Sequence, residues 1–270
     1  MSRVDVDGVS IEYQVTGQGR PVVLLHGFPD SGRLWRHQVP ALAAAGFQVI
    51  VPDLRGYGRS SQPDAVGAYS LALLAGDVQA VLAAEQVSRA HLVGHDWGAA
   101  LAWGLATFAP DQVDHLAVLS VGHPATFLRT LEQRQMSWYM LLFLFPGVAE
   151  RWLSEDNWAN FRSWAGHPDT DQVIADLEAT GSLTPSLNWY RANVPPESWV
   201  EPALMLPPVQ APTMGIWSTA DGALTEAQMT DSAENMAGPW RYERLVGPGH
   251  WMQLEAPDQV NALLLDFLPR

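Results

Sequence analysis

The stretch HLVGHDWGAA, residues 91–100, decides the fold because an apolar run enters a turn crowded with glycine and an aspartate sits at its tip. Gly94 and Gly98 bracket Asp96 at two-residue spacing, as small residues must where a strand turns sharply into a helix. This pattern matches a nucleophile elbow with aspartate where serine is commoner. We expect the turn to strain the backbone of Asp96 and to present its side chain above a sheet, beside the amides at a helix N-terminus.

The segments on either side of this turn alternate between strand and helix patterns. Continuous apolar runs, typical of strands buried on both faces, occupy residues 21–27, 47–53, 90–96 and 114–122. The stretches between these runs have apolar residues at helical spacing, notably at 70–87 and from the elbow to Pro110. The alternation predicts an α/β fold with a parallel sheet and helices on both faces. Asp7-Gly8 inside an alternating run predicts an antiparallel hairpin at the start.

A different pattern interrupts the alternation from about His123 to Pro208. This stretch has short helical pieces, many aromatic residues, and breaks at proline and glycine. Strand patterns return at 211–218 and 241–247, and an amphipathic helix closes the chain. We therefore predict a core in two parts, 1–123 and 209–270, with a helical cap at 124–208.

The composition is that of a packed globular protein. Of the 270 residues, 47% are hydrophobic and 16% are charged. The formal charge of −14 argues against nucleic acid or an anionic membrane as partner. Zero cysteines exclude thiolate catalysis and cysteine-ligated metals. The N-terminus has no apolar stretch of signal-peptide length, and the longest apolar run, 139–145, is too short to span a bilayer, so we expect a cytoplasmic protein.

Two later residues complete a triad with Asp96 in the chain order nucleophile, acid, base. Asp221 follows a predicted strand, and His250 lies in a glycine-rich loop after the last predicted strand. A histidine held in one tautomer by a carboxylate can act as a general base. A single histidine is more often structural, and an aspartate after a strand is often a helix cap, so the prediction depends on the joint order. The other place for the acid, after the strand at 114–122, has no carboxylate.

An aspartate nucleophile limits the reaction. A carboxylate that attacks a carbonyl gives a mixed anhydride, whereas one that attacks an sp³ carbon gives a stable alkyl ester that water can hydrolyse. The leaving group is then a halide or the oxygen of a strained ring. An ordinary esterase would require serine at the elbow. Neither remaining reaction needs a metal or an organic cofactor.

Three motifs carry a family resemblance: HGFPDS at 26–31, DLRGYGRS at 53–60 and GHDWG at 94–98. With them the chain resembles the α/β-hydrolase superfamily over essentially its whole length, and within it the epoxide hydrolases similar to the soluble mammalian and microbial enzymes. The resemblance implies a mostly parallel eight-stranded sheet with a helical cap. It also implies an oxyanion hole from the Phe28 and Trp97 N–H groups and a cis bond between Phe28 and Pro29. The first and third motifs are shared with dehalogenases.

The cap tyrosines favour the epoxide. Tyr139 and Tyr190 lie in contexts similar to those of the cap tyrosines of epoxide hydrolases. A phenol with a pKa of about 10 can hydrogen-bond the ring oxygen and protonate it as it leaves. Both residues could instead pack the cap as ordinary core residues. Met140 stands where the family commonly has glutamine, which leaves the substrate preference open.

The alternative reaction is that of a haloalkane or haloacid dehalogenase. Haloalkane enzymes usually place an amide side chain where this chain has Phe28, and fluoroacetate-type enzymes place arginine where it has Trp97. Both departures favour a small hydrophobic epoxide, with water as the second substrate, in a pocket lined by Phe28, Trp97, Met140 and Trp251. A non-enzymatic receptor could use the same scaffold, but it would not need the triad and both tyrosines.

Overall fold

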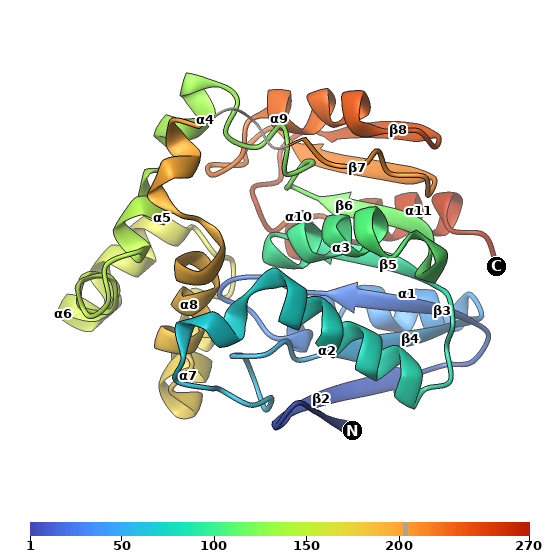
Figure 1. The fold of residues 1–270 in the computed structure, drawn as a ribbon, viewed down its shortest axis with the longest axis horizontal. Coiled ribbons are helices and arrows are strands. Elements are labelled where there is room, and N and C mark those ends of the chain that lie inside the picture. The colour runs from blue at the N-terminus through green and yellow to red at the C-terminus, as the bar shows by residue number, and fades with distance from the viewer. Residues whose placement is uncertain (202–204) are drawn as a thin grey trace.

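The computed structural model describes residues 1–201 and 205–270 of the chain. These residues form one eight-stranded sheet in the order β1-β2-β4-β3-β5-β6-β7-β8, with helices on both faces (Figure 1). β2 pairs antiparallel with β1 and with β4, and the other neighbours are parallel. The structure confirms the predicted sheet. The strands are β1 (Ser2–Val6), β2 (Val9–Thr16), β3 (Arg20–Leu25), β4 (Phe47–Pro52), β5 (Ala90–His95), β6 (Val113–Leu119), β7 (Thr213–Ser218) and β8 (Trp240–Leu245).

The strand β3 shows why the central runs are apolar without alternation. Val23 and Leu25 pack into the hydrophobic core on one face of the sheet, and Val22 and Leu24 pack into the core on the other face. All four side chains are fully buried. Because successive side chains of a strand point to opposite faces, a strand with helices on both sides needs an apolar residue at every position.

The hairpin at the start has the predicted turn. Asp7 and Gly8 both have positive φ, 47° and 82°. Positive φ at both central residues is what a two-residue type I′ turn requires, and it aligns Val6 with Val9 in the β1–β2 register.

The helices fall into two groups, those that flank the sheet and those inserted between β6 and β7. The flanking helices are α1 (Gln38–Ala44), α2 (Leu71–Ala84), α3 (Trp97–Phe108), α9 (Glu226–Thr230), α10 (Met252–Glu255) and α11 (Pro257–Phe267). The inserted helices, called here the helical segment, are α4 (Leu131–Met136), α5 (Trp138–Phe143), α6 (Val148–Ala165), α7 (Thr170–Thr180) and α8 (Leu183–Asn193). Across residues 1–201 and 205–270, no helix has both the length and the apolar character needed to cross a membrane.

The helical segment lies beside the sheet, with α5 to α8 grouped at one side of it (Figure 1). Two side chains of α8 make hydrogen bonds to backbone groups of the core. Trp189 Nε1 donates to the Arg55 carbonyl at 2.9 Å, and Asn193 Oδ1 accepts from the Leu71 N–H at 2.9 Å. The described residues of the stretch predicted to be the cap contain five α-helices. Its exact boundaries, 124–208, stay a prediction, and residues 202–204 lie outside the described residues.

Candidate active site

The elbow at Asp96 has the predicted geometry. β5 ends at His95, α3 begins at Trp97, and Asp96 between them has φ 53° and ψ −125°. A Cβ added to Gly94 would collide with the Gly98 carbonyl oxygen, and one added to Gly98 would collide with the Leu25 carbonyl oxygen. Both glycines are needed because the helix start packs directly on the neighbouring backbone. The left-handed φ of Asp96 is a strained conformation that the surrounding structure holds in place.

The loop after β3 closes on one oxygen of Asp96. The Phe28 N–H donates to Asp96 Oδ1 at 2.7 Å, and the Phe28–Pro29 bond is cis, as the resemblance implied. A Cβ on Gly27 would collide with the same oxygen and would come within 2.6 Å of the Trp97 nitrogen. The loop thus lies against both the carboxylate and the Trp97 amide. Asp96 Oδ2 is left to face the base and the cavity.

The structure brings His250 and Asp221 together beside this oxygen. His250 Nδ1–H donates to Asp221 Oδ2 at 3.0 Å, which leaves Nε2 pointing to Asp96 Oδ2 at 3.7 Å. Asp221 Oδ1 accepts from the N–H groups of Ala223 and Leu224 at 2.9 and 3.0 Å. Because both carboxylate oxygens of Asp221 are engaged, the imidazole is held in one tautomer and one orientation.

The charges of the Asp221 and Asp96 carboxylates determine the direction in which the pKa of His250 is shifted. Burial alone would lower the pKa of His250, but the adjacent Asp221 and Asp96 carboxylates outweigh it and raise that pKa to about 10. Burial alone would raise the pKa of Asp221, but His250 and two backbone N–H groups bring it below its ordinary value. In the resting state His250 is therefore an imidazolium between two carboxylates.

A second histidine fixes the backbone of the first. His95 Nε2 donates to the His250 carbonyl at 2.9 Å, and Ser120 Oγ donates to the same oxygen at 3.1 Å. Burial, with the charge of His250 as the next cause, lowers the pKa of His95 to about 4. A neutral His95 suits a group whose role is to donate one hydrogen bond to a carbonyl.

The helical segment supplies both predicted tyrosines. Tyr139 lies on α5 and Tyr190 on α8, with ring centroids 6.3 Å apart, and the Tyr190 ring lies 5.0 Å from that of Trp97. Burial, followed by the charge of Asp96, raises the pKa of both hydroxyls above its ordinary value. Both phenols are therefore protonated donors at every ordinary pH.

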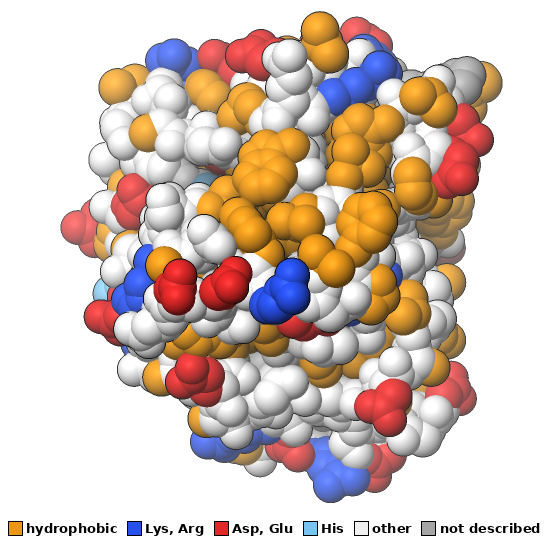
Figure 2. Space-filling view, turned by 90° about the vertical axis from the view of Figure 1, so that its left-hand side faces the viewer, with side chains coloured by type: hydrophobic (Ala, Val, Ile, Leu, Met, Phe, Trp, Pro, Cys, Tyr) orange, Lys and Arg blue, Asp and Glu red, His pale blue; other side chains and the backbone are white. Residues whose placement is uncertain are grey.

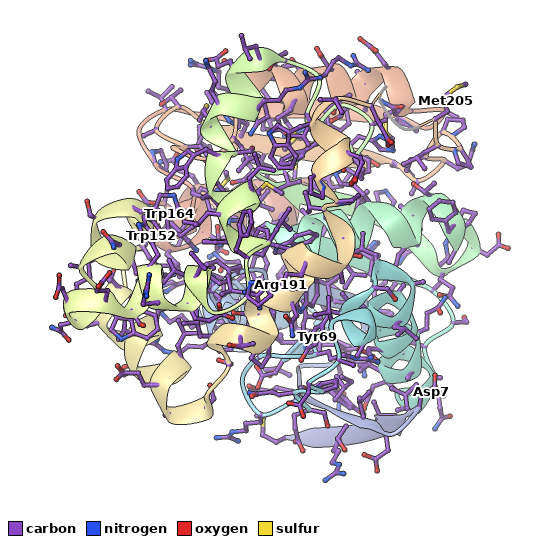
Figure 3. The ribbon with its side chains drawn as sticks, turned by 60° about the vertical axis from the view of Figure 1, so that its left-hand side comes forward. Asp7, Tyr69, Trp152, Trp164, Arg191 and Met205 are labelled. Atoms are coloured by element: carbon purple, nitrogen blue, oxygen red, sulfur yellow. The ribbon has the colours of Figure 1, made fainter. Side chains whose placement is uncertain are left out.

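Aromatic packing and one ion pair hold the tyrosines in place. Trp152 and Trp164 lie close together in the helical segment (Figure 3), and the Trp164 ring is 4.8 Å from that of Tyr139. Arg191, one residue after Tyr190, donates to the Phe143 carbonyl at 3.0 Å and pairs with Glu150 at 2.9 Å. These contacts join α5 and α8, which carry the two tyrosines, to α6.

Asp96, Tyr139 and Tyr190 line one cavity of about 530 Å³. Trp97 and Met140 line it as well, as predicted, together with apolar side chains from both the core and the helical segment. The remaining lining residues are Leu71, Ala100, Val121, Gly122, Pro124, Ala125, Phe127, Leu128, Arg129, Arg134, Asn193, Val194, Pro195, Ser198, Glu201 and Leu224. Over the helical segment, hydrophobic side chains also gather on the outer face of the molecule (Figure 2).

Two predicted pocket residues are not among those that line the cavity. The Phe28 ring packs between Phe143 and Tyr190, with centroid distances of 5.7 Å to each, so its N–H and not its ring serves the site. The Trp251 ring packs on His167 at 4.4 Å, and its Nε1 donates to Asp30. Because its indole N–H bonds to Asp30, the Trp251 side chain does not line the cavity.

A buried cluster that was not predicted from the sequence joins three parts of the chain. Asp30 accepts from Trp251 Nε1 at 2.9 Å and from His167 Nε2 at 3.2 Å, while the Asp169 N–H donates to His167 Nδ1 at 2.9 Å. It links the loop after β3, the helical segment and the residue after His250. Asp30 stands in the quoted motif at 26–31, but its partners lie 137 and 221 positions away, and no local pattern signals such pairs.

Comparisons with known proteins agree with this arrangement. The family described as the alpha/beta hydrolase fold matches residues 20–257. Epoxide hydrolase A of Mycobacterium tuberculosis is 34% identical over 98% of this chain and 96% of its own length, and epoxide hydrolase 3 of Xenopus tropicalis is 31% identical over 98% and 76%. The crystal structure of Bacillus megaterium epoxide hydrolase in complex with an inhibitor superposes with a TM-score of 0.90, at 28% identity and full coverage of both chains.

Proposed function

Because the chain belongs to the α/β-hydrolase fold family and, within it, to the epoxide hydrolases, we propose that it opens an epoxide to a vicinal diol through a covalent ester of Asp96. One observation carries the proposal. A carboxylate on a strained elbow and two buried phenols from the helical segment line the same cavity. The carboxylate supplies the nucleophile, and the phenols supply the donors that an alkoxide leaving group needs.

In the first step Asp96 Oδ2 attacks a ring carbon and the carbon–oxygen bond of the ring breaks. Oδ2 is the nucleophile because Oδ1 is already held by the Phe28 N–H. The ring oxygen accepts hydrogen bonds from Tyr139 and Tyr190 as negative charge develops on it, and it takes the proton of one of them. The products are an alkyl ester on Asp96, a neutral hydroxyl and one phenolate.

In the second step water attacks the carboxyl carbon of the ester. The phenolate formed in the first step first takes the proton of the His250 imidazolium. His250, now neutral and oriented by Asp221, removes a proton from that water, and the former Oδ1 becomes the oxyanion. The Phe28 N–H already lies 2.7 Å from this oxygen, and the Trp97 N–H opens the adjoining helix. The first donor is therefore in place before the charge forms, and we assign the Trp97 N–H as the second. When the intermediate collapses, the bond to the alkyl oxygen breaks and this oxygen takes the proton that the attacking water left on the intermediate. The diol is released, Asp96 is a carboxylate again and His250 is again an imidazolium.

The cavity favours a small, largely apolar epoxide. Its volume of about 530 Å³ falls within the roughly 300–1,000 Å³ range of small-molecule sites. Side chains such as Leu71, Val121 and Phe127 surround the polar end formed by Asp96 and the tyrosines. Met140 adds no hydrogen-bonding group beside Tyr139, so substrate binding depends on apolar contact at that point.

Single-turnover hydrolysis in ¹⁸O-labelled water tests the route. With excess enzyme and styrene oxide, we expect the label in the Asp96 carboxylate and an unlabelled diol, because water attacks the carboxyl carbon. Label that enters the first diol directly would reject the ester.

The variant His250→Ala tests the assignment of the base. It should accumulate an adduct, seen as an increase in intact mass equal to that of the substrate. The matched control is His37→Ala, which removes an exposed imidazole and should turn over without an adduct. If His250→Ala binds the epoxide and shows no adduct, His250 is not the hydrolytic base.

A further inference from the structure

A second group of titratable side chains lies at the opposite edge of the sheet from Asp96. His91 is near the start of β5, and Asp114 and His115 are near the start of β6, whereas Asp96 follows the end of β5. Nδ1 of each histidine lies 3.6 Å from a different oxygen of Asp114. The three ligand atoms all lie within 4.8 Å of one another. Nothing in the proposed hydrolysis uses these residues.

The hydrogen bond of His91 fixes which of its nitrogens carries the lone pair. His91 Nε2 lies 3.0 Å from the Pro269 carbonyl oxygen, which can only accept, so Nε2 carries the hydrogen. In the neutral ring, Nδ1 is then an unprotonated acceptor that faces a carboxylate. The His91 side chain is fully buried, and within 1–201 and 205–270 neither its Nδ1 nor the buried Nδ1 of His115 has a hydrogen-bond partner.

Asp114 already pairs with Arg20 and Arg89, but neither arginine satisfies Nδ1 of His91, and a positive ion between this nitrogen and the carboxylate would do so. The lone pair on His91 Nδ1 repels those of the facing Asp114 oxygen, and the separation of 3.6 Å between Asp114 and each Nδ1 is too long for a hydrogen bond. The same separation is close to the spacing of two ligands on one tetrahedral ion. Bonds of about 2.0–2.1 Å to nitrogen or oxygen place neighbouring ligand atoms roughly 3.3 Å apart.

We propose that His91, Asp114 and His115 bind a divalent transition-metal ion of the zinc type. Two imidazoles and a carboxylate are ligands that zinc accepts. The Nε2–H of His91 on a backbone carbonyl is the outer hydrogen bond that histidine ligands of metals almost always make. The His115 side chain is 20% exposed, which leaves a side of the site open to a water ligand.

Two neighbouring arginines lower the expected affinity of the site for the metal ion. Arg20 lies 2.5 Å from Asp114 Oδ2 and Arg89 lies 3.8 Å from Oδ1, so they orient the carboxylate and also oppose the charge of the ion. We therefore expect weaker binding than at a closed structural zinc site. Because Pro269 is held by His91, the ion would fasten the end of the chain to the starts of β5 and β6 and would stabilise the fold.

Zinc titration of the full-length, chelator-treated protein tests the site by calorimetry and by thermal unfolding. We expect one Zn²⁺ per chain and a rise in Tm of a few degrees. His115→Asn should weaken binding by about tenfold or more and remove most of the rise in Tm. His37→Asn, an exposed histidine outside the cluster, should bind as the wild type does. Absence of binding, or equal binding by wild type and His115→Asn, would overturn the site.

Cobalt(II) provides a readout that does not depend on the stability of the variant. The wild type should give the intense visible absorption of a low-coordinate cobalt ion, and Asp114→Asn and His115→Asn should both lose it. Variants at His91 are less useful because its ring is fully buried in the sheet. A wild-type spectrum identical to that of aqueous cobalt(II) would refute the ligand set.

Discussion

The charges of Asp221 and Asp96 together keep His250 protonated, and Asp96→Asn removes the second of these charges with little change of shape. The Asp96 and His250 groups are 3.7 Å apart. At an effective dielectric constant of about 20, a pair of unit charges at this distance interacts by roughly 4 kcal/mol, or about 3 pKa units. The pKa of His250 is about 10 with both carboxylates present, so it should fall to about 7 in the variant. Esterification of Asp96 removes the same charge.

NMR titration of the histidine ring signals measures this shift directly. We expect His250 of the wild type to remain protonated up to about pH 10 and that of Asp96→Asn to titrate near neutrality. Asp258→Asn, which removes an exposed carboxylate on α11, should leave the titration of His250 unchanged. A decrease of less than about one pKa unit in Asp96→Asn would refute the argument that Asp96 keeps the base protonated.

The raised pKa of His250 also makes the stability of the fold depend on pH. The pKa of His250 is raised on folding, so the associated stabilisation is complete below its unfolded value of about 6.5 and is lost as the pH rises through about 10. In Asp96→Asn most of this stabilisation disappears, and what remains should be lost near pH 7. Urea unfolding at pH 6 and pH 9 should show a larger difference between the two proteins at the lower pH.

Three further changes give outcomes of different kinds. Tyr139→Phe and Tyr190→Phe should each lower the rate of ester formation by roughly 10²-fold in stopped-flow assays, with circular dichroism spectra unchanged; a loss below about threefold would assign the residue to packing. Gly98→Ala places a Cβ against a carbonyl oxygen of β3, so it should unfold at clearly lower urea concentration than the wild type, and an unchanged midpoint would contradict the close packing. Arg55→Ala leaves the buried carboxylate of Asp77 unpaired and should cost about 3–5 kcal/mol in urea unfolding, whereas a cost below about 1 kcal/mol would mean that water replaces the guanidinium.

The features predicted from the sequence are those with a local cause. The elbow was predictable because its glycines stand at a fixed spacing around Asp96. Gly94 is required by a contact with the Gly98 carbonyl oxygen inside the elbow, whereas Gly98 is required by the backbone of Leu25 on β3. The parallel sheet was predictable because burial on both faces produces an uninterrupted apolar run such as β3. Asp221 and His250 were found by their order along the chain and their places after predicted strands. The fold brings these two residues together in space, and the order of the three residues along the chain is typical of that fold.

The features that were missed depend on contacts between distant segments. The expectation for Trp251 failed because its indole N–H has a partner in Asp30, 221 positions earlier, which turns the ring away from the cavity. The cluster of His91, Asp114 and His115 exists only because β5 and β6 are neighbours in the sheet. Histidines near the starts of two strands carry no signal until the strand order is known.

The charge of Asp96 also offers a physical reason for the order of the two steps. While it is present, it raises the pKa of Tyr139, Tyr190 and His250 together. The phenols then keep their protons for the epoxide, and the imidazolium cannot activate water before the substrate has reacted. Formation of the ester removes this charge, so His250 can give its proton to the phenolate and can then accept one from water. A neutral residue at the elbow would leave both steps without this control, even with every other side chain in position.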